Sequence, residues 1–111
     1  MREMGRFGFE EMQDIQRELQ AKYFDRWGGL EPRKGRDSLL WMMIEAGEAA
    51  DVIKKKGDRP ILEDPDTRRH FIEELCDVMM YFNDLMLCYG ITPSELEEVY
   101  WAKHRKNMSR W

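Results

Sequence analysis

The sequence predicts an all-α protein, a single domain of residues 1–111 arranged like a four-helix bundle. Apolar residues recur at three- and four-residue steps along most of the chain, as amphipathic helices require. Segments rich in glycine and proline separate four such stretches. No stretch alternates polar and apolar residues as a half-buried strand does, and no Asn-Gly or Asp-Gly hairpin turn is present.

The first half of the chain predicts two helices. The first is expected at residues 8–27, and the segment 28–36, with three glycines and a proline, is expected to be a loop. Asp37 or Ser38 is the expected N-cap of the second helix, which ends before Gly57. The apolar face of the first helix carries Phe9, Met12, Leu19, Tyr23 and Trp27.

The second half predicts two more helices. A connection at residues 58–66 contains two prolines, and the third helix runs from about 67 to 89, before Gly90. The fourth helix, to about residue 107, begins with Thr92-Pro93-Ser94-Glu95. This segment combines a capping box with proline at the first helical position.

Composition excludes several classes of function. The 111 residues carry 18 Lys+Arg against 22 Asp+Glu, a net charge of −4, which argues against nucleic acid as a partner. No apolar stretch is long enough to span a membrane. Cys76 and Cys88 lie too far apart on one helix to form a disulfide, and free thiols suit a reducing compartment. We expect a soluble cytoplasmic protein that binds neither nucleic acid nor membrane.

The second predicted helix carries acidic residues among apolar ones. Glu45 and Glu48 share a face with Trp41, Ile44 and Val52. The opposite face is also apolar: Leu39, Met43, Ala46 and Ala50. We therefore expect this helix to be buried on two sides, with oligomerisation through helix faces. Buried carboxylates one turn apart require cations to neutralise them.

The third predicted helix repeats the pattern with Glu74 and Asp77, three residues apart. Two such pairs on adjacent antiparallel helices can bring four carboxylates together. A cage of hard oxygen ligands suits Mg²⁺ or Mn²⁺, and Mg²⁺ commonly completes its coordination with substrate phosphates. The alternative is that these acids lie on solvated faces or form surface ion pairs.

Two further groups of polar residues are candidates for substrate contacts. Gln16 and Gln20 fall on the apolar face of the first helix, where their amides could contact a nucleobase, with Trp41 as an aromatic neighbour. The alternative is that this face is simply core. The last helix ends in a basic run, Lys103, His104, Arg105, Lys106 and Arg110, which suits the helix dipole and could also hold phosphates.

The segments Glu45-Ala-Gly-Glu48 and Glu74-Leu-Cys-Asp77 resemble the ExxE and ExxD motifs of the MazG-like, all-α nucleoside triphosphate pyrophosphohydrolase superfamily, which includes the dimeric dUTPases. Lys106-Asn107-Met-Ser-Arg110 is similar to the KNxxR segment of that superfamily, and Lys103 matches a lysine one turn earlier. The resemblance covers about residues 8–111.

The resemblance implies hydrolysis of a nucleoside triphosphate to the monophosphate and pyrophosphate with Mg²⁺, in a homodimer or homotetramer. It implies that Glu45, Glu48, Glu74 and Asp77 are the catalytic metal ligands. Phosphates would be held, in the same or a neighbouring subunit, by Lys103, Lys106, Asn107 and Arg110. Gln16-Arg-Glu-Leu19-Gln20 is similar to the QxxLN base-binding segment of dimeric dUTPases, but it has Gln in place of Asn, which leaves uracil specificity open.

Three alternatives compete with this hypothesis. Phosphoribosyl-ATP pyrophosphohydrolase shares the metal chemistry, but its paired-Glu segment is not evident. A di-iron carboxylate bundle needs Glu-x-x-His motifs, and neither His70 nor His104 follows a Glu by three residues. A helical interaction module would need cations facing the acids. Base and sugar specificity, the number of metal ions and the choice between dimer and tetramer stay open.

Overall fold

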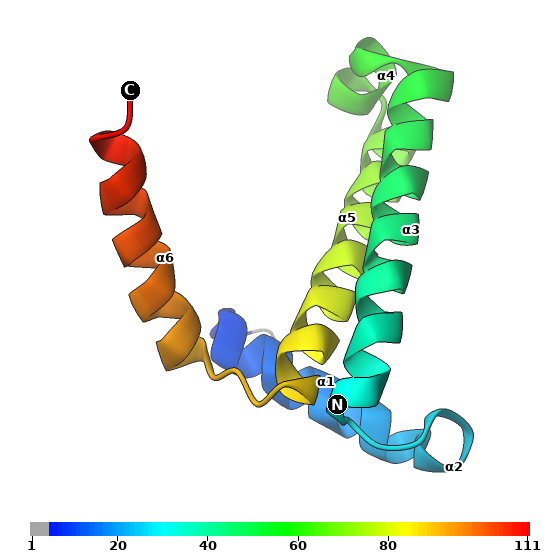
Figure 1. The fold of residues 1–111 in the computed structure, drawn as a ribbon. Helices are drawn as coiled ribbons and strands as arrows, with labels where there is room; N and C mark the ends of the chain where they lie inside the picture. Colours follow the sequence, from blue (N-terminus) through cyan, green and yellow to red (C-terminus); the bar gives the residue numbers. More distant parts are fainter. Residues whose placement is uncertain (1–4) are drawn as a thin grey trace.

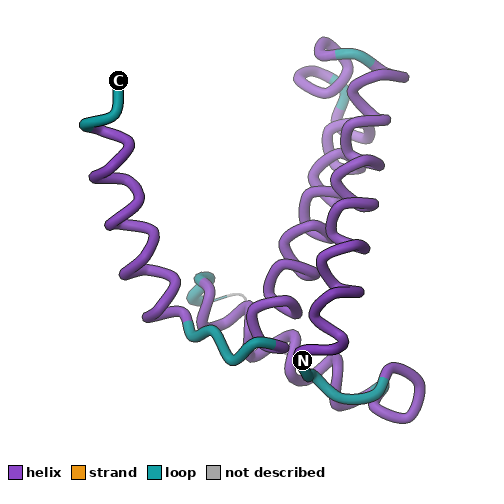
Figure 2. The backbone as a smooth tube through the Cα atoms, in the orientation of Figure 1, coloured by secondary structure: helices purple, strands orange, loops and turns teal. Residues whose placement is uncertain are grey.

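A computed structural model describes residues 5–111 as an all-helical protein (Figure 1). This part of the chain contains only helices, turns and loops, which confirms the all-α prediction (Figure 2). Among these residues, no helix has the length and apolar character needed to cross a bilayer. The helices are α1 (Phe9–Lys22), α2 (Phe24–Trp27), α3 (Pro32–Lys56), α4 (Asp58–Glu63), α5 (Pro65–Cys88) and α6 (Pro93–Met108).

The centre of the fold is a hairpin of two long antiparallel helices, α3 and α5, with α4 at the turn between them (Figure 1). Gly57 ends α3 with a φ of 83°, in the left-handed region that glycine adopts without strain. Asp64 begins α5 because its side chain accepts a hydrogen bond from the Thr67 backbone N–H, at 3.0 Å. These local signals set the two helices side by side along their length.

Helix α1 crosses the end of the hairpin opposite α4 and packs against α5 (Figure 1). The rings of Phe9 and Phe82 meet edge to face, with centroids 6.0 Å apart. Gln13 is fully buried and donates from Nε2 to the Ile91 carbonyl at 3.1 Å. The inward face of α1 therefore places amide side chains, as well as aromatic ones, against α5.

The predicted boundaries in the first half of the chain are partly wrong. Tyr23 interrupts the expected helix 8–27 and divides it into α1 and α2. The loop expected at 28–36 ends early, because α3 already begins at Pro32, whose fixed φ suits the first helical turn. Ser38 is consequently a buried residue inside α3 and caps nothing.

Gly35 is compatible with this early start because Tyr89 packs against its backbone. A Cβ at Gly35 would lie 2.4 Å from a ring carbon of Tyr89. Glycine at this position therefore allows the Tyr89 ring to lie directly against the backbone of α3.

The connection expected at residues 58–66 also contains a helix, the six-residue α4.

The start of α6 follows the prediction. The Thr92 side chain accepts from the Glu95 backbone N–H, the Glu95 side chain accepts from the Thr92 backbone N–H, and Pro93 occupies the first turn. The helix does not, however, complete a bundle: it projects away from α3 and α5, leaving an open V (Figure 1). The four long helices are thus present, but only three of them pack together.

The two-sided burial expected for α3 is not found within one chain. Leu39 and Met43, from the face opposite the paired acids, are exposed, as are Ala46 and Ala50. The same chain exposes apolar side chains on α6, including Val99 and Trp101. Because α6 leaves the hairpin uncovered, nothing within the described chain shields these faces.

Candidate functional site

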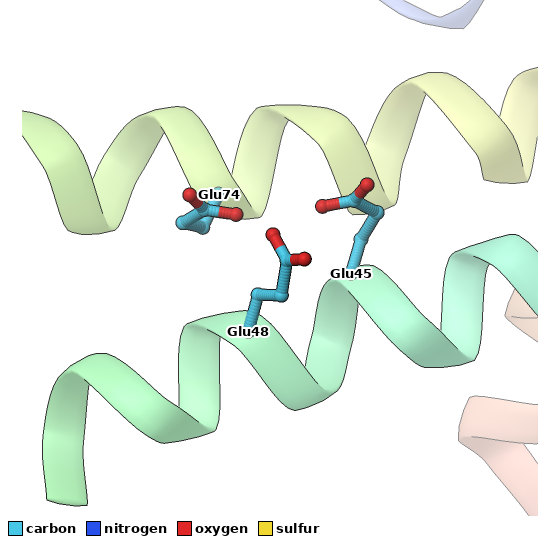
Figure 3. Close-up of side chains that lie close together, drawn as sticks. All are labelled: Glu45, Glu48 and Glu74. Carbon is cyan, nitrogen blue, oxygen red and sulfur yellow. The ribbon is translucent and has the colours of Figure 1, made fainter.

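Three glutamates from the central hairpin converge on one point. Glu45 and Glu48 project from α3 and Glu74 from α5, and all three point into the space between the helices (Figure 3). One carboxylate oxygen from each lies within 4.8 Å of the others. The spacing of three residues places the first two on one side of α3, and the antiparallel register brings the third opposite them.

This acidic cluster lacks the donors that buried carboxylates need. Glu45 Oε2 and Glu74 Oε2 are buried and have no hydrogen-bond partner among residues 5–111. The imidazole of His70 lies near Glu74, with Nε2 3.6 Å from Oε1. Two orphaned acceptors at one place are costly, and a bound cation would satisfy both.

The electrostatics of the cluster point the same way. Burial and then the charge of Glu48 raise the pKa of Glu45 above its ordinary value, and the charge of Asp77 adds to the effect. Burial also raises the pKa of Glu74, and the neighbouring carboxylate of Glu48 adds to the effect. Without a cation, both groups are held where their charged form is disfavoured.

Asp77, the fourth predicted ligand, lies at the edge of this cluster. It is half-buried and lines the same cleft as Glu45, and its charge acts on that residue. The oxygens that lie within 4.8 Å of one another belong to the three glutamates of the cluster. The structure thus brings three of the four predicted carboxylates together and leaves Asp77 on the cleft side.

The residues present fit a divalent cation such as Mg²⁺. The donors are all carboxylate oxygens, which are the ligands that hard cations prefer. The two unpartnered buried oxygens supply an independent reason for a cation at this position. Glu48 is exposed, so the cluster remains open to solvent on one side.

A cleft of about 840 Å³ adjoins the cluster on the side of α1 and α2. Glu45 and Asp77 form its border with the acidic cluster. One wall is aromatic, with the rings of Trp41 and Tyr81 5.8 Å apart. A flat ring would therefore find an aromatic wall in this cleft, and Glu45 connects the cleft to the acidic cluster. Glu48 and Glu74, the other two members of the cluster, line a second cleft of about 490 Å³.

The two glutamines predicted for base contacts lie in this cleft, but they already have a partner. Gln16 Nε2 donates to Asp84 Oδ1 at 2.9 Å, and Gln20 Nε2 donates to Asp84 Oδ2 at 3.2 Å. All three side chains are buried and line the cleft. Burial raises the pKa of Asp84, while the two amide hydrogen bonds and Lys34 act in the opposite direction. Gln20 Oε1 is buried without a donor.

The structure adds three cations that the sequence analysis did not single out. Arg26, Arg33 and Lys34 line the cleft at the corner between α2 and α3. Lys34 Nζ donates to the Trp27 carbonyl, which holds the corner together. These residues lie in or beside the segment predicted to be a loop, and no motif marked them. Their place in the cleft follows from the start of α3 at Pro32, which the sequence analysis did not predict.

The basic residues at the end of the chain lie elsewhere. Lys103, Lys106 and Arg110 are exposed, Asn107 is half-buried, and all are at the far end of α6 (Figure 1). Because α6 projects away from the hairpin, these side chains do not reach the acidic cluster of their own chain.

Comparisons with protein-family models, curated proteins and solved structures found no match to this chain.

Proposed function

We propose that the protein is a Mg²⁺-dependent nucleoside triphosphate pyrophosphohydrolase of the MazG-like type. The observation that carries the proposal is the pair of buried, unpartnered oxygens on Glu45 and Glu74, within a carboxylate cluster that opens into an aromatic-walled cleft. The cluster supplies a cation site, and the cleft supplies room for a nucleoside. The motifs at residues 45–48 and 74–77 supply the resemblance.

The residues divide the work of hydrolysis between them. Glu45, Glu48 and Glu74 would hold Mg²⁺, which supplies charge neutralisation at the phosphates and activation of water. Asp77, on the cleft side of the cluster, would orient the attacking water toward phosphorus and accept its proton. Arg26, Arg33 and Lys34 would stabilise phosphate charge from the α2–α3 corner of the same cleft.

The proposal is tested by measuring pyrophosphate release from a panel of ordinary, deoxy and modified triphosphates with Mg²⁺. Glu48→Gln is expected to lower turnover by more than about a hundredfold. Removing a metal ligand costs more activity than removing a residue that only orients a ligand. Glu97→Gln, an exposed acid on α6, is the matched control and is expected to keep full activity. Equal rates for Glu48→Gln and the unmodified protein would contradict the ligand assignment. Phosphoribosyl-ATP is included because cleavage of that substrate alone would favour the related enzyme.

The proposed enzyme also includes a second copy of the chain. The accessible surface is 9019 Å², whereas a monomer of this mass exposes about 6,500 Å². The excess of roughly 2,500 Å² per chain, about 5,000 Å² for two copies, lies at the upper end of the range that obligate homodimers bury. Exposed apolar side chains on α3 and α6, including Met43 and Trp101, are the surfaces that a partner would cover.

A second copy would also bring basic residues to the acidic cluster. Lys103, Lys106, Asn107 and Arg110 do not reach the cluster of their own chain, so their predicted phosphate contacts require a partner's α6. Mixing Glu48→Gln with Arg110→Ala chains tests this arrangement. Mixed dimers would contain one intact site, so roughly a quarter of full activity should return after subunit exchange. Absence of any recovery in demonstrably mixed dimers would place Arg110 outside a shared site.

A further inference from the structure

Two buried side chains of the cleft, Asp84 and Gln20, carry hydrogen-bond acceptors. Asp84 is 4% exposed and Gln20 is 8% exposed, and both line the cleft. Gln20 Oε1 has no donor in the described part of the chain. A buried acceptor without a donor is costly, and a ligand that donates there recovers that cost. The cleft therefore favours an occupant with N–H groups at its inner edge.

The donors of the same region are directed to the carboxylate. Gln16 and Gln20 each turn their amide nitrogen to a different oxygen of Asp84, at 2.9 and 3.2 Å. This arrangement holds both amides in one orientation. It leaves the side-chain oxygen of Gln20 without a hydrogen-bond donor among the described residues. A ligand carbonyl brought to this place would meet the carboxylate and an amide oxygen, both of which repel it.

We infer that the cleft selects bases that present an exocyclic amine, as cytosine and adenine do, over bases that present a carbonyl at that position, as uracil and hypoxanthine do. The inference rests on the proposed function for a nucleotide as the occupant. Trp41 and Tyr81 provide the stacking wall, which any base would use equally. Discrimination then comes from the acceptors of Asp84 and Gln20.

The first experiment compares matched substrates on the unmodified protein, so it needs no variant that folds. Pyrophosphate release is measured for dCTP against dUTP and for dATP against dITP. Within the faster pair, the amine-bearing member should have a kcat/KM about tenfold to a hundredfold higher, the range expected when a buried acceptor loses its donor. Equal values, or preference for the carbonyl-bearing member, would overturn the inference and leave the proposed function standing.

The second experiment changes the acceptors. Asp84→Asn replaces one acceptor by a donor at nearly constant size, so the ratio of kcat/KM within the pair should fall toward one. Gln13→Met is the matched control: Gln13 is an equally buried glutamine on α1, but it donates to Ile91 and does not line the cleft. Its ratio should stay that of the unmodified protein. An unchanged ratio in folded Asp84→Asn protein would overturn the assignment.

A third measurement separates failure of this inference from failure of the proposed function. If no triphosphate is hydrolysed, binding of deoxycytidine and deoxyuridine is measured by calorimetry without metal. Tighter binding of deoxycytidine would uphold the selectivity of the cleft in the absence of the reaction. Equal binding, or none, would overturn the inference as well.

Discussion

Two acidic centres on the same hairpin, one buried and one half-buried, differ in how their charge is satisfied. Asp84 receives a hydrogen bond on each oxygen, from Gln16 and Gln20. The acidic cluster of Glu45, Glu48 and Glu74 places carboxylates together and leaves two buried oxygens without a donor. The first centre is complete within the chain, whereas the second requires something from outside. This difference separates a carboxylate held by side chains of its own chain from carboxylates that need a cation.

The largest expected effect on stability concerns the satisfied centre. Asp84→Ala would remove two hydrogen bonds to a charged acceptor and leave the amides of Gln16 and Gln20 buried without it. We expect the free energy of unfolding to fall by about 3 kcal/mol, measured by urea denaturation. A loss well under about 1 kcal/mol would show that water or rearranged amides replace the carboxylate, and would remove the contrast between the two centres.

The acidic cluster should show a smaller effect, because its charged carboxylates destabilise the metal-free folded state. Burial raises the pKa values of Glu45 and Glu74 in the folded state, so folding favours their protonated forms. At pH values above 4.5, the ordinary pKa of a glutamate, these two groups hold more protons in the folded protein than in the unfolded chain. The free energy of unfolding of metal-free protein should therefore fall as pH rises from 4.5 through the raised pKa values, and then level off.

The control for this pH dependence uses the cluster itself. Glu45→Gln removes one titrating group, so its unfolding free energy should decline less over the same pH range, as followed by thermal melting. Saturating Mg²⁺ should also reduce the decline, because the ion stabilises the charged carboxylates and raises the melting temperature at neutral pH. An identical decline in unmodified protein with and without Mg²⁺ would contradict a metal site at the cluster.

The positions of the paired acids could be predicted because helical spacing is local. Residues three apart on one helix share a side, and a short connection makes neighbouring helices antiparallel. Glu45, Glu48 and Glu74 therefore converge as expected. Asp77 shows the limit of the same argument, since a fourth carboxylate one turn farther along α5 lies toward the cleft.

The contacts of Gln16 and Gln20 could not be predicted in the same way. Both amides were candidates for contact with a base, with a packed core as the alternative, and each donates to Asp84, a residue more than sixty positions away in the sequence. Which side chain meets Gln16 depends on where α1 crosses α5, and no local pattern reports that crossing. The cations of the α2–α3 corner could not be predicted for a related reason. Their position in the cleft depends on where α3 begins.

The sequence by itself determined the helical class, the end of α3 at Gly57, the capped start of α6 at Thr92 and the spacing of the paired acids. Each of these depends on residues within about one helical turn of one another. Only the tertiary structure decided that Asp84 is satisfied while the acidic cluster is not, and that α6 leaves the hairpin. Those outcomes depend on how whole helices cross, which sums many weak contacts between residues distant along the chain.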